Sequence, residues 1–265
     1  MREERRWRKL QVMAACLVLL LGISLYQNHK ENQLKATMDG ILVQETLGTK
    51  VSETKEKRKV YLTFDDGPSK YTEEILDILK KEQVKATFFV IGYEGKVYAE
   101  RYRRIVEDGH TLAMHAYEHD YNKIYCSVEN FSKDLKKLQT LLEKTTGVKP
   151  TIYRFPGGSS NSAIKHSVNQ FIHYLNKENI TYYDWNALNE DAMNKKLTPQ
   201  QLNANIMKDL PNHDPCIVLM HDLGDRHATV EALEPLIQIL KKMNCELLPI
   251  TEVTPTIQHV KNKEK

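Results

Sequence analysis

Several classes of protein are excluded by what this sequence lacks. Its 265 residues include only four cysteines, and none of them forms a close pair: Cys16 lies in an apolar run, while Cys126, Cys216 and Cys245 are far apart. The odd number outside that run gives no disulfide framework, and no zinc-knuckle spacing occurs. We find neither an internal repeat nor a low-complexity segment. The formal net charge is only +3 and the basic residues are spread along the chain, so we predict no nucleic-acid partner.

Long apolar runs are also scarce, and the single example lies near the N-terminus. Five basic residues in MREERRWRK precede residues 10–26, a run of 17 residues without charge. That length is at the short end for a membrane span. Because basic flanks remain in the cytoplasm, we predict a cytoplasmic segment at residues 1–9, a transmembrane anchor at 10–26 and an extracytoplasmic remainder.

A cleaved signal peptide is the alternative for this N-terminal region, and it would make the protein secreted. The sequence SLYQNHKENQ at the end of the run contains no small-x-small cleavage site. Cys16 lies within the run and not at its end, where a lipoprotein cysteine would stand. We therefore expect an uncleaved, single-pass protein of the cell membrane.

The rest of the chain reads as a stalk, one domain and a short tail. Residues 27–58 are polar and nearly without periodicity, which is typical of a stalk. Between residues 59 and 256, short β-branched apolar runs alternate with longer helical patterns, and residues 257–265 form a polar tail. The strand candidates are VYLTF, ATFFVIG, TLAM, TIYRF, ITYYDW, CIVLM and ELLPI. The helical patterns lie in YTEEILDILKKE, VYAERYRRIVEDG, SVENFSKDLKKLQTLLEKTTG, NSAIKHSVNQFIHYLNKEN, TPQQLNANIMKDL and TVEALEPLIQILKKM.

This alternation predicts an α/β fold with a parallel sheet and helices outside it. Seven strand–helix units suggest an irregular (β/α)7 barrel that need not close completely. A doubly wound open sheet is the alternative.

Polar side chains follow four of the predicted strands at the point where each strand ends. Asp65 and Asp66 follow VYLTF, His115 follows TLAM, Arg154 lies in TIYRF, and His221 follows CIVLM. The carboxyl ends of parallel barrel strands meet on one face, where active sites form. Asp-Gly-Pro is also ordinary turn sequence, but a turn alone does not account for this convergence. Two adjacent carboxylates repel each other unless a cation or a proton intervenes.

The segment HAYEH offers two further ligands for such a cation. His115 and His119 are four residues apart, so they would lie on one face if the segment were helical. Two histidines and one carboxylate form a metal site with open positions for water and substrate. The alternative is two solvated histidines in a loop. One carboxylate of the Asp pair could then bind the metal while its neighbour takes a proton from the water that the metal activates.

These motifs resemble, in order, those of the polysaccharide deacetylase family (the NodB-homology domain, carbohydrate esterase family 4). The resemblance runs from about residue 59 to 254, roughly three-quarters of the chain. TFDDGPS is similar to the first motif, and the resemblance implies that Asp65 is the general base and Asp66 a metal ligand. HAYEH resembles the second motif, which implies His115 and His119 as the other protein ligands. The family's usual cofactor is a divalent metal, for which we expect Zn²⁺, with Co²⁺ or another divalent ion as alternatives.

RFPGGS and LMH resemble the third and fifth motifs. By this resemblance Arg154 orients the base, the N–H of Gly157 helps to form the oxyanion hole, Leu219 lines the acetyl pocket, and His221 protonates the leaving amine. Further candidates for the substrate pocket are Pro156, Tyr121 and Trp185, although core packing accounts equally well for the aromatic residues.

Two positions depart from the family's pattern. Ala116 stands where the second motif usually has serine or threonine, so a hydroxyl that would brace the loop between His115 and His119 is missing. The fourth motif, usually aspartate followed by tryptophan, is represented only by Asp191 and Ala192. By this resemblance, Asp191 holds His221 and keeps its pKa high enough for an acid.

The resemblance implies a metal-dependent hydrolase that releases acetate from N-acetylglucosamine residues of a cell-envelope polysaccharide, and the predicted anchor favours peptidoglycan. The expected partners are this glycan and, through the N-terminal helix, the membrane; no protein partner is predicted. A chitooligosaccharide or xylan-ester deacetylase with the same site is one alternative. A catalytically silent glycan-binding module is another, supported only by Ala116 and Ala192.

Overall fold

The computed structural model describes residues 32, 56–164, 168–193 and 196–261. The predicted cytoplasmic segment and transmembrane anchor, and nearly all of the predicted stalk, lie outside these residues. The chain divides into two compact units, Met1–Glu53 and Thr54–Lys265, and the fold below is that of the second unit. In the part of the chain that is described, no helix is both long enough and apolar enough to cross a membrane.

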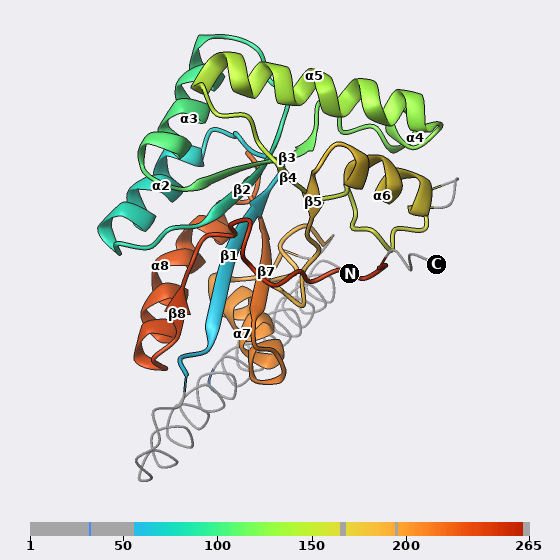
Figure 1. Ribbon diagram of the computed structural model, residues 1–265. Helices are drawn as coiled ribbons and strands as arrows, with labels where there is room; N and C mark the ends of the chain where they lie inside the picture. The colour runs from blue at the N-terminus through green and yellow to red at the C-terminus, as the bar shows by residue number, and fades with distance from the viewer. Residues whose placement is uncertain (1–31, 33–55, 165–167, 194–195, 262–265) are drawn as a thin grey trace, which may run out of the picture. The chain divides into compact units, whose positions relative to one another are not determined.

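A parallel sheet forms the centre of the second unit (Figure 1). Seven strands follow the order β5-β4-β3-β2-β1-β7-β6, and β8 pairs with the start of β1, on residues that precede those paired with β2. Among the described residues no pairing joins β5 to β6, so the sheet is a half-barrel and not a closed barrel. The strands are β1 (Lys59–Asp65), β2 (Thr87–Ile91), β3 (Thr111–Ala116), β4 (Ile152–Tyr153), β5 (Thr181–Tyr182), β6 (Ala187–Leu188), β7 (Cys216–His221) and β8 (Glu246–Leu247).

Helices cover the sheet in a single layer. Neighbouring helices contact one another in the order α7, α8, α2, α3, α5, α6, which follows the order of the strands that precede them. A doubly wound sheet would carry helices on both faces, so the predicted barrel-like α/β architecture is confirmed. The helices are α2 (Thr72–Lys81), α3 (Lys96–Glu107), α4 (Tyr121–Ile124), α5 (Val128–Thr146), α6 (Val168–Lys177), α7 (Pro199–Asp209) and α8 (His227–Lys242), with a 3-10 turn η1 (Leu210–Asn212).

Each of the seven predicted strands overlaps an observed strand, but β6 was not predicted. Ala187–Leu188 is only two residues long, and it lies in a stretch without a β-branched run. It pairs with Val218 and Leu219 of β7. This pairing brings the chain that follows β6, including Asp191, beside the end of β7.

Helix α5 illustrates how local sequence produces an element near the site. The Ser127 side chain accepts a hydrogen bond from the Asn130 N–H at its start, and Gly147 ends it in the left-handed conformation that glycine adopts without strain. Four apolar side chains at helical spacing are buried, and each stabilises the fold by about 1.5–3 kcal/mol. These side chains are Phe131, Leu135, Leu138 and Leu142.

The alternation of side chains along β1 separates two cores. Leu62 and Phe64 point toward the helices, whereas Tyr61, Thr63 and Asp65 point to the inner face of the sheet. The inner face carries an apolar cluster of Tyr61, Phe89, Ala113, Ile152, Tyr183, Ile217 and Ile250, with Trp185, Leu248 and Ile257 packed against it. The chain beyond residue 256, where the sequence predicts a polar tail, reaches this region, because the Ile257 carbonyl accepts a hydrogen bond from the Asp184 N–H at 2.8 Å.

Candidate active site

The two adjacent aspartates at the end of β1 are held in different ways. Asp65 is the last residue of the strand, and its buried carboxylate accepts a hydrogen bond from the Arg154 guanidinium at 2.8 Å. Asp66 leaves the strand with φ 71°, a left-handed conformation that costs a non-glycine residue on the order of 1–3 kcal/mol. Its N–H donates to the Phe89 carbonyl of β2 at 3.1 Å, which fixes this turn. The change in backbone direction lets two neighbouring carboxylates serve different partners.

Asp66 and the two histidines of HAYEH form a compact group. The Asp66 Oδ1 atom lies 3.5 Å from His115 Nε2 and 3.4 Å from His119 Nε2. Ligand atoms of the three residues all lie within 4.8 Å of one another. This Oδ1 atom is buried and has no hydrogen-bond partner among the described residues. A buried carboxylate oxygen without a partner is costly, and a cation held between the three side chains would satisfy it.

The protonation state of His115 suits a metal ligand. Burial lowers the pKa of His115, so the imidazole is neutral near neutral pH. Its Nδ1 lies 2.8 Å from the Arg154 carbonyl and donates its proton there, which leaves Nε2 as the free lone pair facing Asp66. One carboxylate and two imidazoles are a donor set that fits a zinc-like divalent ion. The residues present therefore fit a metal ion.

The sequence analysis placed the two histidines on one face on the condition that HAYEH is helical, and this condition is not met. His115 lies in β3, and His119 lies in the turn between β3 and α4, so the segment is not helical. The two imidazoles meet because the strand delivers one of them and the turn folds the other back over it, with ring centroids 5.3 Å apart.

Arg154 is the most completely buried charged side chain of the site. Its guanidinium donates to Asp65, to the Thr63 hydroxyl at 2.7 Å and to the carbonyls of Tyr183 and Asp184, both at 3.0 Å. A fully buried arginine is stable only when its donors are satisfied in this way. Its position on the inner face of the sheet therefore orients the Asp65 carboxylate.

His221 and Asp191 form a second polar pair at the same edge of the sheet. His221 ends β7 and lies beside Asp65 in the register of β1 and β7. Its Nδ1 is 2.7 Å from Asp191 Oδ1, while Asp191 Oδ2 accepts the His221 N–H at 2.9 Å and the Thr229 hydroxyl at 2.8 Å. Burial opposes protonation of His221, but the hydrogen bond and charge of Asp191 outweigh it and raise the pKa of His221 to about 9.

The predicted pocket residues surround this edge with different degrees of contact. Gly157 is exposed with φ 75°, and a Cβ atom there would lie 3.0 Å from the Tyr121 hydroxyl. Within the described part of the chain no hydrogen bond engages the Gly157 N–H. Leu219 shares a face of β7 with His221, two residues on. Trp185 lies 5.7 Å from the Arg154 guanidinium, at the edge of the inner core.

Pro156 contributes through its backbone. Its carbonyl accepts hydrogen bonds from the Tyr125 hydroxyl at 2.9 Å and from Asn161 Nδ2 at 3.2 Å. These bonds shape the turn that carries Gly157. Ala192, which stands in place of the family's tryptophan, is exposed beside Asp191.

Two buried carboxylates that sequence reasoning missed hold the loops of the site. Asp222 accepts hydrogen bonds from the hydroxyls of Ser69 at 2.5 Å and Thr72 at 2.6 Å, so it fixes the turn after the Asp pair. Asp184 accepts from the N–H of Ser159 at 2.8 Å and thereby fixes the RFPGGS loop. The only signal for either was its place directly beside a residue already singled out, His221 or Trp185.

Comparisons with known proteins identify relatives of this chain. The family described as polysaccharide deacetylase matches residues 52–174. A putative polysaccharide deacetylase of Bacillus subtilis is 32% identical over 250 residues, which cover 86% of this chain and 85% of that protein. The solved catalytic domain of a peptidoglycan N-acetylglucosamine deacetylase from Eubacterium rectale has a TM-score of 0.73 and 34% identity, covering 82% of this chain and 99% of that one.

A further solved structure is also similar to this chain. It is a mutant of a CE4 family pseudoenzyme with restored enzymatic activity, with a TM-score of 0.63 and 29% identity, covering 75% of this chain and 68% of that one. The extent of the B. subtilis match and the agreement in fold leave no doubt about the family. The chain is therefore a member of the polysaccharide deacetylase family, a hydrolase that acts on N-acetyl carbon–nitrogen bonds.

Proposed function

We propose that this hydrolase is a metal-dependent deacetylase of N-acetylglucosamine residues in peptidoglycan, and that it releases acetate. One observation carries the proposal: Asp66 Oδ1 faces two imidazole nitrogens at 3.5 and 3.4 Å, while the neighbouring Asp65 is held apart by Arg154. Such an arrangement separates a metal ligand from a base that remains available for proton transfer. Zn²⁺ is the ion we expect, and Co²⁺ could replace it.

Asp66, His115 and His119 would hold the ion. When bound, it supplies positive charge that lowers the pKa of the attacking water and stabilises negative charge on the amide oxygen. Asp65 then accepts the proton of that water, because Arg154 fixes its Oδ1 and leaves its Oδ2 turned toward His115, 3.8 Å from Nε2.

The remaining steps use groups on the other side of the same edge. The Gly157 N–H donates to the developing oxyanion, since no acceptor within the described residues competes for it. His221, kept protonated by Asp191, donates its Nε2 proton to the leaving amine, because its Nδ1 is already engaged. Leu219 lines the space for the acetyl methyl group.

The relatives and the N-terminal sequence support peptidoglycan as the proposed substrate. A solved relative from E. rectale is a peptidoglycan N-acetylglucosamine deacetylase and shares the half-barrel over nearly its whole length. The basic segment and the apolar run at residues 10–26 support a single-pass membrane anchor with the domain on the outer side, facing the cell wall.

Acetate release tests the proposal directly. Purified protein is incubated with peptidoglycan, with chitooligosaccharides and with acetylated xylan, each with and without a chelator. We expect acetate from peptidoglycan, its loss with chelator and its return with Zn²⁺ or Co²⁺. Faster release from chitooligosaccharides or xylan would reassign the substrate on the same site.

The Asp65→Asn variant separates catalysis from glycan binding. Asparagine keeps the shape of the side chain but cannot accept the proton, so acetate release should fall by about 10²–10⁴-fold while binding to glycan is retained. A parent protein that binds glycan but releases no acetate with either metal would instead be a silent binding module.

A further inference from the structure

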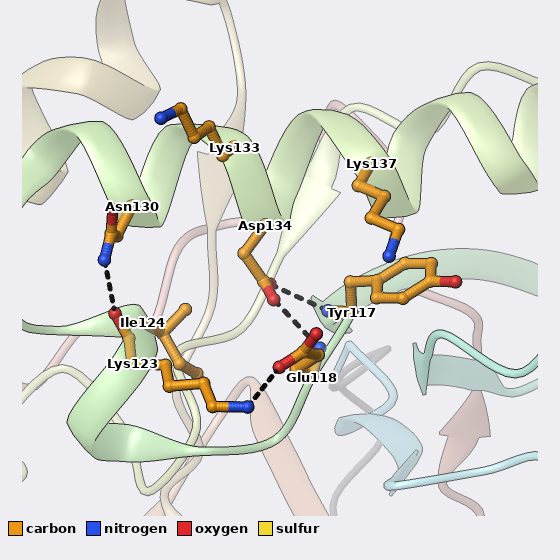
Figure 2. Close-up of a pocket in the computed structure, with 8 residues that line it drawn as sticks. All are labelled: Tyr117, Glu118, Lys123, Ile124, Asn130, Lys133, Asp134 and Lys137. Carbon is orange, nitrogen blue, oxygen red and sulfur yellow. Dashed lines mark hydrogen bonds and ion pairs between the residues drawn. The ribbon is translucent and has the colours of Figure 1, made fainter.

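The turn that carries His119 depends on a carboxylate from outside the site. We define the metal loop as residues 117–119, which follow β3. Asp134 of α5 accepts a hydrogen bond from the Tyr117 N–H at 2.7 Å through Oδ2, and one from the Glu118 N–H at 2.8 Å through Oδ1 (Figure 2). One carboxylate thus engages two successive peptide groups between the two histidines.

The carboxylate of Asp134 is committed to these backbone groups. Nearby lysines have other partners: Lys133 pairs with Glu129 at 2.7 Å, and the Lys137 ammonium lies over the Tyr117 ring, 3.8 Å from its centroid (Figure 2). Partial burial raises the pKa of Asp134, and the two N–H groups work against that rise. Partial removal of a carboxylate from water costs free energy when no cation is paired directly with it. The hydrogen bonds from the loop to Asp134 offset this desolvation cost.

The two histidines differ in how much they need such support. His115 is part of β3, its side chain is only 3% exposed, and its Nδ1 bonds to the Arg154 carbonyl. The side chain of His119 is 31% exposed, and its ring lies beside those of His115 and Tyr121, with centroids 5.3 Å away in both cases. The position of His119 therefore depends on the backbone of the metal loop.

Nothing at position 116 supplies that support. Ala116 is fully buried and has no hydroxyl to brace the loop. The Gly92 N–H donates to the Ala116 carbonyl at 3.0 Å and to the Tyr117 carbonyl at 3.2 Å. The Tyr117 and Glu118 N–H groups themselves donate to Asp134. Glu118 is also tied to Lys123 at 2.7 Å, but through its exposed side chain.

We propose that Asp134 is a positioning residue of the metal site: it holds the metal loop so that His119 Nε2 stays within reach of Asp66 Oδ1. Preformed ligand geometry raises metal affinity, and loss of an outer partner typically lowers it by about 10–100-fold. The inference rests on the proposed metal-dependent function, and it concerns a residue that touches neither the substrate nor the metal.

The test compares Asp134→Asn with Asp108→Asn. Asparagine at 134 can accept only one of the two N–H groups. Asp108 is a matched control, because its side chain is also largely buried, at 17% exposed, and bonds to the Arg104 side chain. It lies just before β3, at the end of that strand opposite to the metal loop. Zn²⁺ affinity is measured by competition with a chromophoric chelator, the Co²⁺ form by its visible absorption, and stability by thermal unfolding of the metal-free proteins.

We expect Asp134→Asn to weaken Zn²⁺ binding by about 10–100-fold, with an altered Co²⁺ spectrum, and Asp108→Asn to change affinity by less than about threefold. Both variants lose some thermal stability. If the Asp134→Asn protein is destabilised but binds Zn²⁺ like the parent, Asp134 is merely structural and the inference is wrong. Should Asp134→Asn not fold, Asp134→Ser is judged by the same comparison. A parent protein that binds no metal would instead overturn the proposed function.

Discussion

Replacing Asp191 by asparagine should move the pH dependence of the reaction in a direction that the structure specifies. The pKa of His221 is raised from 6.5 to about 9 because Asp191 Oδ1 lies 2.7 Å from Nδ1 and offsets the effect of burial. Asparagine removes the negative charge of Asp191 but not the burial, while the charges of Asp65 and Asp66 still favour the protonated imidazole. The pKa of His221 should therefore fall toward its ordinary value.

The magnitude follows from that shift. A general acid must be protonated to act, so the alkaline limb of the rate profile reports the pKa of His221. With values of about 9 and 6.5, the protonated fraction at about pH 8 falls by about 30-fold, whereas at about pH 6 it changes by less than about twofold. A bound cation lowers the pKa in both proteins, so the difference between their profiles is the quantity to measure.

The same shift predicts a loss of stability. Because the folded-state pKa of His221 is the higher one, its contribution is fully present below pH 6.5 and is lost as the pH rises through about 9. The shift corresponds to about 3 kcal/mol, so we expect the Asp191→Asn protein to be less stable by about 2–3 kcal/mol near pH 7.

The assay is acetate release as a function of pH for the parent, Asp191→Asn, His221→Gln and the double variant. His221→Gln should lose the alkaline limb altogether. Because the two residues act as one unit, the double variant should be no slower than His221→Gln alone. Coincident alkaline limbs in the parent and Asp191→Asn would refute the reasoning, since His221 would then not be an acid held by Asp191.

Three further predictions follow from particular contacts. Gly157→Ala should lower the free energy of unfolding by about 1–3 kcal/mol in chemical denaturation and reduce acetate release, because φ is 75° and the new Cβ would lie 2.1 Å from Asn161 Nδ2. Gly147→Ala is the control: φ is 76° there too, but the space is open, so this variant should retain activity. Arg154→Lys keeps the charge but not the four hydrogen bonds, so acetate release at saturating metal should fall by about 10²-fold, and an unchanged rate would contradict the positioning role. Burial lowers the pKa of His110 to about 4, so the free energy of unfolding measured in urea should decrease by up to about 3 kcal/mol as the pH falls from about 6.5 to about 4. His110→Asn should flatten this pH dependence, and an equal slope in the variant would contradict the role given to His110.

The predicted fold was correct where the chain repeats a local pattern. Strands such as β1 and β7 have apolar runs long enough to be recognised, and α5 has four apolar residues on one face between two caps. The two-residue strand β6 carries no such pattern and exists because β7 pairs with it. Closure of the sheet was also beyond prediction, because it depends on pairing between the edge strands β5 and β6 and not on any one segment.

The residues of the candidate site also divide into those that a local pattern predicts and those that only the folded structure reveals. Asp65, Asp66, His115, Arg154 and His221 could be found because each lies at or near the carboxyl end of a recognisable strand. Asp134, Asp184 and Asp222 were not found, since the residue type and position of an acidic side chain do not distinguish a carboxylate bonded to a loop from a solvated one. Only the folded backbone reveals that these carboxylates accept hydrogen bonds from loops that carry the site.

The sequence by itself determined the order of strands and helices and the identity of the groups at the strand ends, because side-chain periodicity and strand polarity are local properties. The tertiary structure decided how those groups are used. The left-handed turn at Asp66 separates two adjacent carboxylates, and a turn after β3, not a helix, brings His119 over His115. Distances of 3.5 and 3.4 Å between ligand atoms depend on packing between segments remote in sequence, which no local pattern encodes.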